Sequence, residues 1–192
     1  MFLRFVFCGH ILSLMRNRAA LIAAVAAGQR PKYLFFWGHT GGPDSKACLS
    51  QWYPAPFEVD GVRYATAEHW MMVGKARLFE PAMIEPILAA PSPAAAKALG
   101  RTVAGFRPDV WDAHKVDIVV EGSVHKFAQN PVMGAFLAGT KQRVLVEAAP
   151  RDRIWGIGLG ADNPKAQDPR TWRGHNHLGF ALMEARARLA GA

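Results

Sequence analysis

Residues 57–79 read FEVDGVRYATAEHWMMVGKARLF and carry two structural signals in direct succession. Apolar and polar residues alternate on both sides of an Asp-Gly pair, which is the strongest short-range signal for a β-hairpin. Thr66 then provides a helix N-cap, and Glu68 falls in the first turn, where the helix dipole favours an acid. The stretch therefore predicts a hairpin followed by a helix that ends near Phe79.

Two kinds of signal mark out the remaining elements. Dense apolar or alternating segments predict strands, and those outside the hairpin cover 33–37, 143–147 and 154–159. Prolines and capping residues delimit the other helices, which are predicted at 81–89, 93–100, 109–129, 131–139 and 176–189. Together they predict an α+β fold: one compact, helix-rich domain with a small β-sheet.

Single residues set the ends of these helices. Gly100 is expected to end the helix that Ser92 and Pro93 begin. Asp109 can cap the long helix, and Asn176 can cap the last one.

Composition excludes several classes of protein. The chain has 192 residues, of which 51% are hydrophobic, so it can bury a core and is not disordered. Only two cysteines are present, which excludes a disulfide scaffold and a cysteine-rich zinc module. No apolar run approaches the length of a membrane span, so we expect a cytoplasmic protein with no membrane partner.

The first 30 residues differ from the rest. They carry four arginines and no acid, and without them the chain has 19 basic and 15 acidic residues. A balance of +4 suits a small anionic substrate better than a broad DNA-binding face. Read from Met15, the extension is similar to a weak secretory signal, and translation starting at Met15 is a further reading. We expect residues 1–30 to lie outside the core.

Two acids stand out as candidate catalytic residues. Glu68 shares a helix face with Met71, Met72 and Lys75. Glu68 and Lys75 are about 10 Å apart along the helix axis. Asp152 precedes Trp155 in a loop, a common place for a site residue. Each acid also has a purely structural reading: Glu68 as partner of the helix dipole, and Asp152 as the residue that holds its own turn.

Basic and aromatic residues are weaker candidates. Arg101 and Lys126 could hold a phosphate, although each alone is typical of a solvated charge. Trp111 alone is typical of a core residue. The spacing of the seven histidines matches no metal motif, and no dinucleotide-binding turn or P-loop is present, so we predict neither a metal nor a cofactor.

The order of these motifs resembles the YbiA-like, or NADAR, family over residues 33–189. The resemblance is carried by short blocks spread along the chain, which are LSQWYP (49–54), TAEHWM (66–71), Gly100-Arg101, Trp111, Lys126-Phe127, Glu147-Ala148, DRIWGIG (152–158) and WRGHNHLG (172–179). Gln51, Trp70, the Val73-Gly74 pair and Ala149 depart from the family pattern, which bears on substrate choice.

The resemblance implies a YbiA-like N-glycosidase domain over residues 31–192. Such a domain hydrolyses the C–N bond between a ribose or ribose phosphate and an amino-heterocycle. The family's acidic and tryptophan positions correspond to Glu68, Asp152, Trp111 and Trp155. Its basic positions correspond, less closely, to Arg101, Lys75 and Lys126, and Asn176 is a further candidate for substrate binding.

Several mechanisms and partners stay open on sequence alone. Glu68 is favoured as the carboxylate that stabilises the charged sugar or activates water, with Lys75 as a covalent variant. The substrate could be an early aminopyrimidine intermediate of riboflavin synthesis or ADP-ribosylated guanine in nucleic acid. Alternatives are a non-catalytic domain that binds ADP-ribose or an NAD derivative, and a nucleic-acid-binding module. The oligomeric state is left undetermined.

Overall fold

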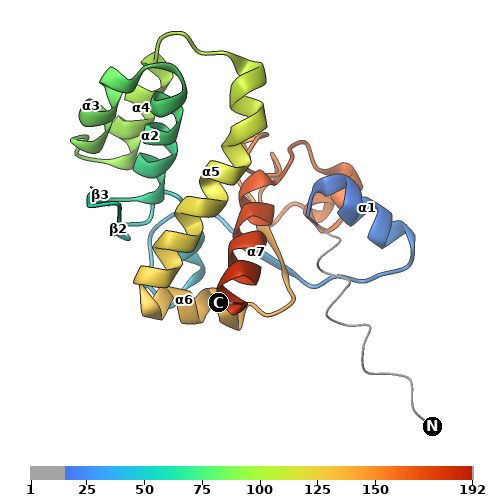
Figure 1. Cartoon of the computed structure of the whole chain (residues 1–192). Coiled ribbons are helices and arrows are strands. Elements are labelled where there is room, and N and C mark those ends of the chain that lie inside the picture. Colours follow the sequence, from blue (N-terminus) through green and yellow to red (C-terminus); the bar gives the residue numbers. More distant parts are fainter. Residues whose placement is uncertain (1–15, 192) are drawn as a thin grey trace. The chain divides into compact units, whose positions relative to one another are not determined.

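The computed structural model describes residues 16–191, which form two compact units (Figure 1). The hypothetical start at Met15 lies outside the described residues. Unit 1 joins the chain up to Trp37 with Thr140–Glu184, and unit 2 comprises Gly38–Gly139 with the C-terminal residues from Ala185. Within residues 16–191, no helix is both long and apolar enough to cross a membrane.

The hairpin of unit 2 forms as the sequence predicts. Strands β2 (Phe57–Val59) and β3 (Val62–Tyr64) pair antiparallel, with Phe57 opposite Tyr64. The two turn residues, Asp60 and Gly61, both have positive φ angles, 52° and 76°. That conformation matches the twist of a two-residue hairpin and is the reason for the Asp-Gly pair. The two facing rings stack with centroids 5.5 Å apart.

Helix α2 (Ala67–Phe79) is the central element of unit 2. The Thr66 Oγ1 accepts a hydrogen bond from the His69 backbone N–H, which confirms the predicted cap. Nine of its thirteen residues are buried, so the helix is enclosed on nearly all sides. The Trp70 Nε1–H donates to the Ile118 carbonyl at 2.7 Å and so ties α2 to the long helix α5.

The other helices of unit 2 follow the predicted order. After the 3₁₀ turn η2 (Lys46–Leu49), they are η3 (Pro81–Met83), α3 (Ile84–Leu88), α4 (Pro93–Thr102), α5 (Pro108–Gln129) and α6 (Pro131–Gly139). Figure 1 shows α2, α3 and α4 lying side by side next to the hairpin.

Two predicted helix ends in unit 2 are wrong. Gly100 does not end α4 but lies within it, and a Cβ at this position would come 2.1 Å from the Met72 sulfur. The glycine therefore allows close packing of α4 on α2. Asp109 is not the cap of α5 but a first-turn residue, and its carboxylate lies 3.0 Å from the Arg107 guanidinium.

Unit 1 is built on two parallel strands. Strand β1 (Tyr33–Phe36) pairs with β4 (Val144–Glu147), and Tyr33 aligns with Val144. The chain between them contains residues 38–139 of unit 2. Two 3₁₀ turns, η4 (Pro164–Gln167) and η5 (Pro169–Thr171), follow later in the chain. The last element is helix α7 (His177–Ala190).

The predicted strand over 154–159 is wrong. This segment is a loop that makes one ladder-like bond, from the Ile157 N–H to the Glu147 carbonyl, and then turns away at Gly158, whose φ is +67°. Its carbonyls instead accept hydrogen bonds from the amides of residues 173–178. We call these two joined segments, 153–158 and 173–178, the loop zipper.

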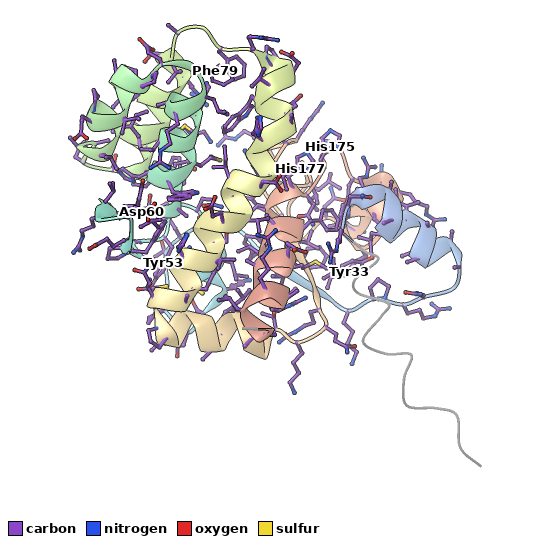
Figure 2. All side chains as sticks on the ribbon, in the orientation of Figure 1. Tyr33, Tyr53, Asp60, Phe79, His175 and His177 are labelled. Carbon is purple, nitrogen blue, oxygen red and sulfur yellow. The ribbon has the colours of Figure 1, made fainter. Side chains whose placement is uncertain are left out.

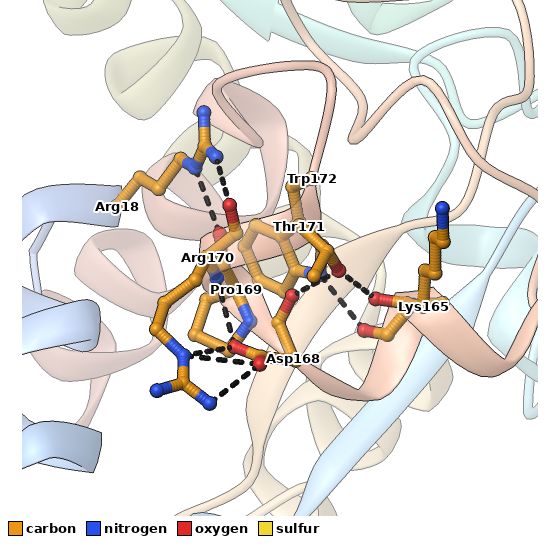
Figure 3. Close-up of polar contacts among 8 residues, drawn as sticks. Arg18, Lys165, Asp168, Pro169, Arg170, Thr171 and Trp172 are labelled. Atoms are coloured by element: carbon orange, nitrogen blue, oxygen red, sulfur yellow. Dashed lines mark hydrogen bonds and ion pairs between the residues drawn. The ribbon is translucent and has the colours of Figure 1, made fainter.

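Part of the N-terminal extension belongs to unit 1, contrary to expectation. Helix α1 (Arg18–Ala26) begins at Asn17, whose side chain caps it. Leu21 is fully buried, and the Arg18 guanidinium donates to the carbonyls of Pro169 and Arg170 at 2.9 and 3.2 Å (Figure 3). Residues 18–26 therefore pack against η5 instead of extending away from the core.

Candidate functional site

Glu68 is a buried acid whose backbone is hydrogen-bonded to a loop distant in the sequence. Its residue is 2% exposed, and it stands in the first turn of α2, just after the Thr66 cap. The Glu68 N–H, which has no partner inside the helix, donates to the Gln51 carbonyl at 3.0 Å. The bond ties the start of α2 to the loop after η2 (Lys46–Leu49).

Lys126 approaches the same loop from α5. It is 2% exposed, and its Nζ donates to the Ser50 carbonyl at 2.8 Å. The ammonium also lies 5.1 Å from the centroid of the Phe127 ring. Burial lowers the pKa of Lys126 to about 7, because the charged form loses its hydration. The enclosed lysine holds the loop through its bond to the Ser50 carbonyl, and its contact with a substrate phosphate stays a prediction.

Cys48 lies near Lys126 and is fully buried. Burial raises the pKa of its thiol to about 11, although Lys126 acts in the opposite direction. The thiol is therefore protonated at neutral pH, and thiolate is the reactive form.

Residues 50–51 thus receive two hydrogen bonds from distant helices, one from Lys126 and one from Glu68. The Ser50 hydroxyl fixes the segment further by accepting a bond from the Trp52 N–H at 3.1 Å. Gln51 itself is buried, with 8% of its surface exposed. Sequence reasoning did not select Gln51 as a site residue, and only its departure from the family pattern drew attention to it.

Lys75 lies on α2 and contacts α4. Its Nζ donates to the Gly100 carbonyl at 2.6 Å and sits 4.2 Å from the centroid of the Phe106 ring. Partial burial lowers the pKa of Lys75, which enlarges the neutral, nucleophilic fraction of the amine.

Arg101 and Trp111 are less constrained. Arg101 is exposed in the last turn of α4, and Trp111 is half-buried in the first turns of α5. Among residues 16–191, neither side chain makes a hydrogen bond or an ion pair with another side chain. Hydrogen bonds therefore connect Glu68 and Lys126 to one loop, whereas no such bond is seen for Arg101 or Trp111 among the described residues.

In unit 1, Asp152 and Trp155 belong to one turn of the loop zipper. The Asp152 Oδ1 accepts hydrogen bonds from the N–H groups of Ile154 and Trp155, each at 2.8 Å. This is the turn-holding role that sequence reasoning set beside the catalytic one. The Trp155 ring is half-buried and meets the edge of the His177 ring at 6.1 Å, and Figure 2 shows His177 beside His175.

Asn176 holds α7 to the sheet. It has a positive φ of 57° and is fully buried. Its Oδ1 accepts from the Glu147 N–H and its Nδ2 donates to the Leu145 carbonyl, both at 2.9 Å. Helix α7 begins directly after Asn176, but the side chain does not cap it as predicted. Its amide group is hydrogen-bonded to the backbone of β4 instead.

The loop zipper also brings together two arginines that the sequence analysis did not select. Arg153 and Arg173 are exposed, and both side-chain stems lie against Gly158, within 3.2 Å of where its Cβ would stand. Only the pairing of the two loops makes them neighbours. Within residues 16–191, no three His, Cys, Asp or Glu side chains gather to hold a metal ion.

Comparisons with known proteins bear on this arrangement. The NADAR domain model matches residues 35–190. N-glycosidase R617 of Acanthamoeba polyphaga mimivirus is 40% identical over 161 residues, which cover 81% of this chain and 95% of the viral protein. N-glycosidase Npun_R5314 of Nostoc punctiforme is 33% identical over 144 residues, with coverage of 74% and 85%. The NMR structure of the E. coli protein YbiA has a TM-score of 0.66 and 26% identity, and covers 84% of this chain and 87% of that chain.

Proposed function

Because the chain belongs to the NADAR domain family, we propose that it is an N-glycosidase, a hydrolase that cleaves the C–N bond between a ribose and an amino-heterocycle. The relatives named N-glycosidases support this activity. The observation that carries it is Glu68, a buried acid whose backbone is bonded to a loop that Lys126 also holds.

Glu68 is assigned the central role in the reaction. As the C–N bond breaks, positive charge builds on the ribose ring, and a carboxylate beside the anomeric carbon stabilises that charge. The same group can accept a proton from the attacking water. Water then supplies the new hydroxyl at the anomeric carbon, and the heterocycle leaves with a proton. Burial strengthens the interaction of the carboxylate with the developing charge, because little water screens it.

The remaining site residues are given supporting roles. In unit 2, Trp111 is the candidate for stacking the heterocycle. In unit 1, the correspondence with the family makes Asp152 the candidate for assisting the departing heterocycle or holding a ribose hydroxyl, and Trp155 a candidate for stacking. Arg101, which is exposed, binds phosphate. Asn176 keeps the loop zipper on β4, so its proposed effect on substrate binding is indirect.

Lys75 offers a covalent variant of the same cleavage. Its amine would attack the anomeric carbon while the heterocycle leaves with a proton, and opening of the sugar ring would give an imine. Water would then hydrolyse the imine, which releases the sugar and restores the amine. The lowered pKa of Lys75 supports this variant.

The proposed substrate is a ribosyl-aminopyrimidine phosphate, an early intermediate of riboflavin synthesis. ADP-ribosylated guanine in nucleic acid is the second candidate, since the same bond type joins its ribose to an amino-heterocycle. Both share an anionic phosphate next to the ribose, which agrees with the basic balance of the chain.

The test is the release of reducing sugar from the ribosyl-aminopyrimidine phosphate by the full chain and by Glu68→Gln. We expect the variant to lose about 10²–10⁴-fold in kcat, the usual contribution of a positioned acid or base. Glu85→Gln is the matched control, because Glu85 is an exposed glutamate in the first turn of α3.

Either of two results would contradict this assignment. A folded Glu68→Gln variant with near wild-type turnover would remove Glu68 from the reaction. A wild-type chain that releases no sugar from this substrate, and none from ADP-ribosylated guanine DNA, would leave ligand binding without chemistry as the function.

A further inference from the structure

The side-chain amide of Gln51 stands out among the buried polar groups of unit 2. Gln51 is more than nine-tenths buried, and its Oε1 accepts no hydrogen bond from residues 16–191. Nearly all buried polar atoms in native proteins have a partner, since an unpartnered one loses its hydration without compensation. A buried acceptor that is retained in this condition calls for a donor from outside the chain.

Another glutamine of the same unit shows the usual solution. The Gln129 amide is exposed, yet both of its polar atoms are bonded: Oε1 accepts from the Glu58 N–H at 2.9 Å, and Nε2 donates to the Glu58 carbonyl at 2.8 Å. That amide has a structural role, because it clamps the hairpin to the end of α5. Gln51 is the more buried of the two, and its oxygen has no such bond.

The backbone around Gln51 is fixed although its amide oxygen is not bonded. Its own carbonyl accepts from Glu68, and the preceding carbonyl, of Ser50, accepts from the buried Lys126 ammonium. These bonds reach Gln51 from α2 and α5 and leave its backbone little freedom. An acceptor on a rigid support binds a ligand with little loss of conformational entropy.

The backbone bond also makes Gln51 a direct neighbour of Glu68. We propose that the Gln51 Oε1 is an acceptor subsite that receives an N–H or O–H donor of the glycoside. This inference rests on the proposed function, because it takes Glu68 to mark the position of the substrate. The donor is either the amino group of the heterocycle or the ribose 2′-hydroxyl, which share the same hydrogen-bond chemistry.

The experiment replaces the amide by a side chain of similar shape that cannot accept such a bond. Gln51→Met and the wild-type full chain are compared for kcat/KM on three probes: the ribosyl-aminopyrimidine phosphate, its 2′-deoxyribosyl analogue, and an analogue that lacks the exocyclic amino group. We expect Gln51→Met to lose about 10–100-fold in kcat/KM on the complete substrate, because a site built to bond a donor discriminates strongly.

The analogues identify the source of the donor. The probe that lacks the bonded donor should be hydrolysed equally by both proteins, while the other analogue should show the full loss. An equal loss on all three probes, or no loss on any, would overturn the inference, since the oxygen would then serve packing or an internal water.

Thermal unfolding separates this role from a structural one. Gln51→Met should melt at the wild-type temperature or above it, because the change removes a buried polar group that lacks a partner. Gln129→Met, the matched control, should melt lower, because it breaks two hydrogen bonds, and it should keep the wild-type response to the three probes. A lowered melting temperature of Gln51→Met with unchanged kcat/KM would also count against the inference.

The proposal and the function on which it rests fail in different ways. An active wild-type chain whose Gln51→Met variant matches it on every probe overturns the acceptor subsite alone. A wild-type chain without glycosidase activity overturns the proposed function and, with it, the subsite.

Discussion

At the scale of single residues, burial decides what Lys126 can do. The same side chain on a helix surface would be a point charge for phosphate, but here its ammonium is enclosed and bonded to the Ser50 carbonyl. Its neighbour Cys48 is equally enclosed, and the two pKa values are displaced in opposite directions by the same cause.

The lowered pKa of Lys126 predicts how stability depends on pH. In the unfolded chain the amine keeps its ordinary pKa near 10.5, so between about pH 7 and that value the unfolded state binds more protons than the folded state. The free energy of unfolding should therefore rise with pH across this window. Urea unfolding at pH 7.0 and 8.0, below the ordinary thiol pKa of 9.0 that Cys48 has in the unfolded chain, should show that rise in the wild type and a smaller one in Lys126→Met.

A matched control for this prediction is Lys97→Met, a lysine on α4 for which no such burial is seen. It should keep the wild-type rise with pH. An equal rise in the wild type and Lys126→Met would mean that the ammonium is hydrated in the folded state.

At the scale of elements, glycines set the distance between helices. Gly122 on α5 faces Trp70 on α2, and a Cβ there would come 2.3 Å from the Trp70 Cδ1 and 2.7 Å from its Nε1. The close approach is what lets the indole N–H reach the Ile118 carbonyl. Helix α5 thus accepts a residue of low helix propensity in exchange for contact with α2.

We predict that Gly122→Ala destabilises the protein in spite of the better helix propensity of alanine. The rigid indole cannot yield as a methionine would, so overpacking should cost about 1–3 kcal/mol in the free energy of unfolding. Denaturant unfolding measures this change. Gly139→Ala, at the end of α6 where a Cβ meets nothing within 4 Å, is the control and should be neutral or slightly stabilising. A Gly122→Ala variant as stable as this control would show that α2 and α5 can move apart at no cost.

At the scale of the whole molecule, distant parts of the sequence meet within each unit. Unit 1 combines the strand β1 with a strand more than a hundred residues later, and α1 docks on η5 through Arg18. The parallel pair needs a long connection between its strands, and residues 38–139 of unit 2 supply it.

The docking of α1 predicts that the N-terminal extension contributes to stability. Removal of residues 1–30 deletes the buried Leu21 and both bonds of Arg18, so it should lower the melting temperature. Leu21→Ala in the full chain tests the same contact with one substitution and should cost about 2–5 kcal/mol. Ala23→Ser, at an exposed position of α1, is the control. A truncated chain that melts like the full chain would show that α1 adds nothing to the core.

Elements whose signals act within a few residues were predictable from the sequence. The hairpin, the capped start of α2 and the strand β4 rest on the Asp-Gly turn, on Thr66 and on alternation, and each is confirmed. The family and the helix-rich α+β fold were also accessible, because the order of motifs along the chain is itself a property of the sequence. The roles of the two candidate acids stay predictions.

Tertiary structure alone decided the features that depend on partners far along the chain. The carbonyl that accepts the hydrogen bond of the buried Lys126 belongs to Ser50, 76 residues away. Gly100 lies inside α4 at the point where Met72 packs against it. Residues 154–159 form a loop whose carbonyls accept hydrogen bonds from residues 173–178. The same dependence explains why Gln51 was not selected: a glutamine in a loop reads as a surface residue until the helices that enclose it are in place. Local signals specify backbone conformation, whereas burial and pairing are set by the neighbours that the fold supplies.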